Sequence, residues 1–130
     1  MVDTTGPPEH FEIGESHAIH RPEGHVSFEE AGELLSQAVL YCRENGIRRL
    51  LIDATNLTGF GMVGIAERFS VGERLAREAM AAVKVAMVVR PELFDPKRFG
   101  ITVARNRGLF SNVFSSESDA MTWLLDPSAE

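Results

Sequence analysis

Residues 49–61 read Arg-Leu-Leu-Ile-Asp-Ala-Thr-Asn-Leu-Thr-Gly-Phe-Gly, an apolar run that meets an aspartate and then passes into residues typical of turns. Apart from Asp53, every residue from Leu50 to Ala54 is apolar. A short run of this kind is typical of a strand that helices cover on both faces. The stretch therefore predicts a buried strand of an α/β domain. The loop that follows it is where such domains usually place their binding sites.

Length and composition favour one domain. The chain has 130 residues, of which 44% are hydrophobic, and this is enough for one continuous core. We expect a disordered lead-in over residues 1–9 and a single domain over residues 10–126. The single Cys42 excludes a disulfide within the chain and is compatible with a cytoplasmic location. No signal peptide is visible, and no apolar run approaches the roughly 20 residues of a membrane-spanning helix.

The charge balance excludes one large class of partner. The chain carries 13 Lys and Arg residues against 19 Asp and Glu residues, a net charge of -6. Nucleic-acid binders present a basic surface, so this balance argues against that function. The average surface would also be repelled by an anionic membrane.

The N-terminal third predicts two strands and a helix. Alternating apolar residues favour strands over residues 11–13 and 17–21, and a tight turn at residues 22–24 is expected to end that pair. Ser27 and Glu30 have the spacing of a capping box, which predicts the start of a helix. The remaining elements expected are a helix over 62–80, a strand over 83–89, a helix over 96–107, a strand over 109–114 and a helix from Ser116. This alternation predicts an α/β fold with a mixed sheet, mostly parallel in its second half.

Several segments together carry a family resemblance, and they are residues 22–24, 27–30, 51–53, 57–60, 88–92, 99–108, 113–115 and 120–124. In this order and spacing they resemble the SpoIIAA-like proteins of the STAS superfamily, which are similar to bacterial anti-sigma-factor antagonists and to CRAL-TRIO lipid-exchange domains. The resemblance spans about residues 17–125. It implies a four- or five-stranded sheet flanked by about four helices, and a role in binding rather than in catalysis.

The chain departs from the anti-sigma-factor antagonists at one position. Those proteins carry a phosphorylatable serine at the start of the helix after the central strand. Residues 60–65 correspond to that site here and contain no hydroxyl group, so phosphorylation of the usual kind is excluded. Thr55 and Thr58 lie upstream, and nothing in the sequence transfers the modified position to them.

The loop after the central strand permits two interpretations. Phe60, Met62 and Ile65 gather around glycines and could open onto a groove for a lipid-like ligand or touch a membrane surface. Alternatively, Phe60 and Ile65 close the top of the core, and the glycines only make the turn.

Basic residues concentrate within residues 90–107, and they are Arg90, Lys97, Arg98, Arg105 and Arg107. Arg98 and Arg105 are seven positions apart, so they share one face of the helix expected there. Such a group could hold the phosphate or carboxylate of a small anionic ligand. The alternative is that these arginines are exposed and pair with nearby acidic residues.

Two other groups raise the question of a metal or an active site. His10, His17, His20 and His25 lie close in sequence, but His17 and His20 point to opposite faces of a strand, so solvated hairpin histidines are the alternative to a metal site. Asp53 could act as a general base, but a base needs a nucleophile or a second titrating group beside it. We expect Asp53 instead to accept backbone hydrogen bonds and to shape the loop.

The sequence therefore predicts a non-enzymatic, cytoplasmic binding module without metal or cofactor. Its ligand would be lipid-like or a small anion, with peripheral membrane contact and a homodimer as further expectations. The residues hypothesised to line the site are Asp53, Thr58, Phe60, Met62, Ile65, Arg98 and Arg105. The alternative function is a regulatory adaptor that binds another protein.

Overall fold

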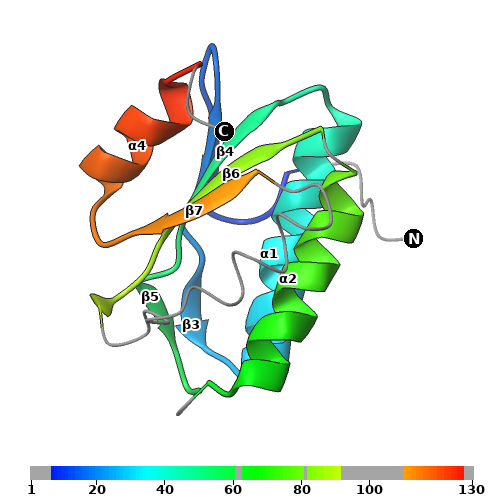
Figure 1. Cartoon of the computed structure of the whole chain (residues 1–130), viewed down its shortest axis with the longest axis vertical. Helices are drawn as coiled ribbons and strands as arrows, with labels where there is room; N and C mark the ends of the chain where they lie inside the picture. The colour runs from blue at the N-terminus through cyan, green and yellow to red at the C-terminus, as the bar shows by residue number, and fades with distance from the viewer. Residues whose placement is uncertain (1–6, 61–62, 81, 92–109, 128–130) are drawn as a thin grey trace.

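The apolar run after Arg48 forms strand β4 (Arg49–Asp53), in the middle of a five-stranded sheet. The computed structural model describes residues 7–60, 63–80, 82–91 and 110–127 (Figure 1). The strand order is β1-β2-β4-β6-β7, and the other four strands are β1 (Phe11–Ile13), β2 (Ala18–His20), β6 (Lys84–Val88) and β7 (Ser111–Phe114). Strand β1 is antiparallel to β2, and all other neighbours in this sheet are parallel. The predicted mixed α/β sheet is confirmed.

Helices cover both faces of this sheet. Helices α1 (Phe28–Glu44) and α2 (Ile65–Ala79) lie side by side on one face, and α4 (Glu117–Leu125) lies on the other (Figure 1). Side chains of a strand alternate between faces, so Ile52 joins the core beneath α1 and α2 while Leu51 joins the core beneath α4. Both side chains are fully buried, which explains why β4 is apolar on both faces.

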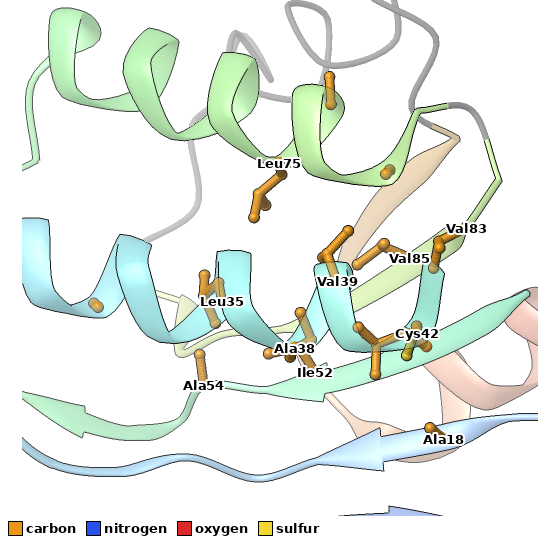
Figure 2. Close-up of a cluster of buried hydrophobic side chains, with 14 of the residues drawn as sticks. Ala18, Leu35, Ala38, Val39, Cys42, Ile52, Ala54, Leu75, Val83 and Val85 are labelled. Carbon is orange, nitrogen blue, oxygen red and sulfur yellow. The ribbon is translucent and has the colours of Figure 1, made fainter. Parts of the chain in front are cut away.

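The larger core lies between the sheet and the helix pair. Figure 2 shows Leu35, Val39 and Cys42 of α1 with Leu75 of α2 above the strand side chains. Gly72, Leu75, Ala76 and Ala79 of α2 are buried. Small residues dominate this buried face of α2 because α1 and α2 approach each other closely here. An added Cβ on Gly32 of α1 would stand 3.2 Å from the Arg74 guanidinium of α2.

The helix starts follow the predicted capping chemistry. The Ser27 hydroxyl accepts a hydrogen bond from the Glu30 backbone N–H, and the Glu30 carboxylate accepts one from Ser27, each at 3.0 Å. At the start of α4, the Ser116 hydroxyl accepts a hydrogen bond from the Asp119 backbone N–H. Helix α2 begins three residues later than expected, at Ile65, because the Glu67 carboxylate accepts a hydrogen bond from the Gly64 N–H and makes Gly64 the N-cap.

One sequence prediction is wrong. Residues 22–24 were expected to form a turn, but Glu23–His25 is a strand, β3, which pairs in parallel with β5 (Asn56–Thr58). This β3-β5 pair continues the β2-β4 pair after a break: two residues separate His20 from Glu23, whereas three separate Ile52 from Asn56. One extra residue on one strand is the arrangement of a β-bulge, which bends the pair away from the main sheet. Figure 1 shows β3 and β5 beyond the main sheet, near one end of α1 and α2.

The part of the chain that the structure describes contains three helices. The fourth helix, expected over residues 96–107, and Leu109 of the last expected strand lie outside the described residues. Among the described helices, none combines the length and the apolar character needed to cross a membrane.

Candidate functional site

The carboxyl ends of the parallel strands bring three charged residues to one edge of the sheet. Arg21 follows β2, Asp53 ends β4, and Arg90 lies two residues beyond the end of β6. Arg21 and Asp53 each stand two positions after a residue that faces α4, so the alternation of strand side chains directs both toward the α4 side. We call Arg21, Asp53 and Arg90 the strand-end row.

Arg21 forms hydrogen bonds to two carboxylates. Its Nε and Nη2 atoms donate to the two carboxylate oxygens of Glu117, both at 2.9 Å, and its Nη1 donates to Glu12 at 2.9 Å. The fork onto Glu117 is the bidentate geometry in which arginine binds carboxylates most strongly. This contact lowers the pKa of Glu117 to about 2 and raises the pKa of Arg21. Arg21 therefore ties β1, β2 and the first turn of α4 together.

Asp53 lies between this ion pair and the loop. Its Oδ1 atom accepts hydrogen bonds from the Thr55 backbone N–H at 3.0 Å and from the Thr55 hydroxyl at 2.6 Å. These are the loop-shaping bonds that the sequence predicted. Burial, and to a smaller extent the neighbouring Glu117 carboxyl group, raises the pKa of Asp53 against the opposite effect of Thr55.

Arg90 has a different environment from Arg21. It is half-buried, and its Nε atom is shielded from solvent and has no hydrogen-bond partner in the part of the chain that the structure describes. Its one hydrogen bond to the described residues is a long contact of 3.5 Å from Nη2 to the Leu57 carbonyl oxygen of β5. Within the described ranges, no carboxylate pairs with Arg90. Toward the described residues, the guanidinium therefore uses little of its hydrogen-bonding capacity.

The loop residues of the hypothesised site have structural contacts. The Thr58 hydroxyl donates to the Gly24 carbonyl oxygen at 3.4 Å and so helps to join β5 to β3. Phe60 stacks edge-on against Phe28 at 5.6 Å between ring centroids and packs against the main core. This placement of Phe60 corresponds to the alternative in which it closes the top of the core.

The structure brings together only part of the hypothesised site. Asp53, Thr58 and Phe60 lie on one segment that runs from β4 through β5. Ile65 is the first residue of α2. Met62, Arg98 and Arg105 lie outside the described residues, so their role in a site stays a prediction.

Two charged residues at this edge of the sheet, Arg21 and Glu117, were not predicted as residues of a site. Arg21 and Glu117 are 96 positions apart and meet only in the folded chain. The signal that could have found them is their position: Arg21 follows a predicted strand, and Glu117 opens the helix after another parallel strand. Parallel strands end at the same edge of the sheet, so such residues converge.

The histidines do not gather into one cluster. His20 is 1% exposed, and neither ring nitrogen has a hydrogen-bond partner among the residues that the structure describes. Burial, with a smaller effect of His10, lowers its pKa to about 4. His10 lies 3.9 Å from Glu23, and His17 contacts Ser16. The described part of the chain holds no group of three or more His, Cys, Asp or Glu side chains arranged to bind a metal ion.

Comparison with other proteins assigns neither a family nor a function to this chain. No protein-family model, curated protein or solved structure matches the chain significantly. The resemblance to SpoIIAA-like proteins therefore stays a prediction from the sequence segments that carry it.

Proposed function

We propose that the chain is a binding module of the SpoIIAA-like type, and that it holds the anionic group of a small ligand at Arg90. The observation that carries the proposal is the half-buried Arg90 guanidinium, whose shielded Nε atom lacks a partner among residues 7–60, 63–80, 82–91 and 110–127. A charged or polar group that is withdrawn from water without a hydrogen bond is unfavourable. A carboxylate or phosphate provides two oxygens in the geometry that a guanidinium binds best.

The strand geometry supports a site at this position. The Ala54 backbone N–H donates a hydrogen bond to the Val88 carbonyl oxygen. The next strand along the chain, β5, pairs with β3 and not with β6. Beyond Val88, the described contact between the two segments is the long bond from Arg90 to Leu57. The carboxyl ends of parallel strands are the usual place for ligands in α/β sheets, because the strands stop pairing there.

The experiment is a calorimetric titration with inorganic phosphate and, separately, with laurate. Phosphate represents a simple anion, and laurate represents a lipid-like carboxylate with an apolar tail. We expect Arg90→Gln to weaken binding of the favoured probe at least tenfold, because the guanidinium makes the anion contact. The matched control is Arg48→Gln, which removes the same charge from an exposed residue at the opposite end of β4 and should change affinity less than twofold.

The outcomes separate the proposed function from its alternative. Equal loss of binding in both variants would show that only net charge matters and would refute a site at Arg90. If the wild-type chain binds neither phosphate nor laurate, the proposal fails. A protein partner retained by Arg90→Gln in a pull-down would then favour the adaptor function.

A further inference from the structure

Strand β2 carries a buried histidine that the proposed anion site does not use. His20 is 1% exposed, and neither ring nitrogen has a hydrogen-bond partner within the described ranges. A neutral imidazole has one donor and one acceptor, so its burial without partners is unfavourable. Histidine is also the side chain whose charge ordinarily changes near neutral pH. His20 is therefore a titratable group held in an apolar environment.

The side chains around His20 come from the two neighbouring strands and from α1. Phe11 of β1 and Ile52 of β4 are its register partners, and register partners point to the same face of a sheet. The ring centroids of Phe11 and His20 lie 5.9 Å apart, and Phe11 also meets the Tyr41 ring of α1 edge-on at 5.2 Å. Because β1 is the first strand in the sheet order, Phe11 covers His20 from the edge of the sheet.

Strand β1 has few contacts that hold it in place. It is three residues long, with Glu12 and Ile13 exposed and Phe11 only partly buried. Its ion pair from Glu12 to Arg21 is largely exposed, and such pairs contribute little stability. His10, directly before the strand, has a φ of 58°, a left-handed conformation that is unfavourable for a residue with a Cβ atom. Short edge elements of this kind open at a lower free energy than the core.

The charged groups near His20 do not stabilise its protonated form. Burial, and to a smaller extent His10, lowers the pKa of His20 to about 4. Glu23 of β3 lies 3.9 Å from His10, and Tyr41 is the titratable group contributed by α1. The ion pairs of Arg21 lie on the opposite face of the sheet, because successive strand residues alternate. Among the residues that the structure describes, no carboxylate forms an ion pair with His20.

We propose that His20 and β1 form an acid-operated latch, in which protonation of the buried imidazole opens β1 from β2 while the rest of the sheet stays folded. A buried imidazolium without a partner is unfavourable, and displacing Phe11 lets water reach it. By linkage, the open form becomes more populated as the pH falls from about 6.5 toward 4. Opening leaves the backbone of β2 as the new edge of the sheet. This inference goes beyond the anion site, and Arg90 takes no part in it.

The test is amide hydrogen exchange of the whole chain, followed by NMR at about pH 7 and about pH 4.5. The reporter is the Arg21 N–H, which donates to the His10 carbonyl oxygen at 2.9 Å across the β1-β2 pair. The reference is the Lys84 N–H, which donates to the Arg48 carbonyl oxygen at 2.8 Å in the middle of the sheet.

We expect the protection factor of the Arg21 amide to fall about fiftyfold between these pH values. This is the ratio that follows from a His20 pKa of about 4 in the closed form and 6.5 in the open form. Low concentrations of urea should leave the protection of Arg21 unchanged and reduce that of Lys84, because local opening exposes little surface.

Three variants sharpen the test. His20→Leu removes the titrating ring and keeps an apolar side chain, so the protection of Arg21 should change less than about twofold with pH. The matched control, His17→Leu, removes a half-buried imidazole from the turn between β1 and β2 and should keep the wild-type pH dependence. Phe11→Ala uncovers His20, so the pKa of His20, followed by NMR of the imidazole, should rise from about 4 toward 6.5.

Three results would overturn the latch. If His20→Leu keeps the wild-type pH dependence, another group controls the opening. If the Arg21 and Lys84 amides have equal protection and respond equally to urea, the whole sheet opens at once. If Phe11→Ala leaves the pKa of His20 unchanged, β1 is not the element that shields it from water.

Discussion

Arg21 and Arg90 occupy corresponding places in the fold and differ in almost everything else. Both lie where a parallel strand of the same sheet ends. Arg21 meets Glu12 and both oxygens of Glu117, whereas among the described residues Arg90 has one long bond to a backbone carbonyl and its buried Nε atom has no partner. The comparison teaches that tertiary contacts, and not the place at a strand end, decide whether an arginine is paired with carboxylates.

The position of α4 explains the difference. Its first turn brings Glu117 to Arg21, while its last turn is held at the start of β6. There Lys84 donates to the carbonyl oxygens of Trp123 and Asp126 at 3.0 and 2.9 Å, and its ammonium group lies 4.5 Å from the centre of the Trp123 ring. A cation at the last carbonyls of a helix stabilises that end. The helix is therefore anchored at both ends, and its acidic first turn is directed to Arg21.

The largest effect should come from breaking the β3-β5 pair beside Arg90. Gly59 has a φ of 106°, and an added Cβ would stand 2.6 Å from the Val26 carbonyl oxygen and 2.8 Å from its nitrogen. Because both atoms are backbone, Gly59→Ala should lower the free energy of unfolding by about 4 kcal/mol, through overpacking and backbone strain. Gly46→Ala is the control: φ is 71° but nothing lies within 4 Å, so about 1 kcal/mol is expected. Equal losses in urea unfolding would contradict the close approach.

Acid should destabilise the fold through His20, the last residue of β2, which directly precedes Arg21. The pKa of His20 falls from 6.5 to about 4 on folding, so the unfolded chain binds the proton more tightly. The stability is complete above about pH 6.5 and is lost as the pH falls toward 4, by about 2 to 3 kcal/mol near pH 4.5. His20→Leu should abolish this loss and also remove a buried nitrogen without a partner. Urea unfolding at about pH 7 and 4.5 measures it, and an unchanged pH dependence in the variant would exclude His20.

The third experiment compares the two arginines directly. Arg21→Met leaves Glu12 and Glu117 without their cation and should lower the free energy of unfolding by about 1 to 2 kcal/mol. This is less than a buried ion pair would give, because the Arg21 side chain is 41% exposed. Arg90→Met should change stability by no more than about 0.5 kcal/mol, since no ion pair with the described residues is lost. The comparison fails if denaturant unfolding at neutral pH gives the two variants equal losses.

The smallest effect concerns Asp53, which lies between the two arginines. Thr55→Val removes the 2.6 Å hydroxyl bond to Asp53 and keeps the backbone bond. We expect a loss of about 1 kcal/mol in stability. The hydroxyl bond lowers the pKa of Asp53, so the variant should raise that pKa further. Carbon-13 NMR of the Asp53 carboxyl measures the change, and a pKa that falls would mean that Thr55 does not stabilise the ionised form.

Much of the fold could be read from local patterns. The apolar run of β4, the capping pair of Ser27 and Glu30, and the cap at Ser116 each act within a few residues, so the sequence predicted them correctly. Strands β3 and β5 escaped prediction because each has three residues and no hydrophobic period of its own. Their pairing joins segments more than thirty residues apart, and the extra residue between β4 and β5 becomes visible only from the register.

The sequence by itself determined the α/β class, the buried central strand and the chemistry present at the strand ends, because these depend on residue type and local spacing. It also supplied every charged group of the strand-end row. Only the tertiary structure decided which arginine is neutralised, since Arg21 meets Glu117 across 96 residues of chain. A charge pair depends on distances of a few ångströms, and such distances between remote segments are set by how α4 packs on the sheet rather than by any local pattern.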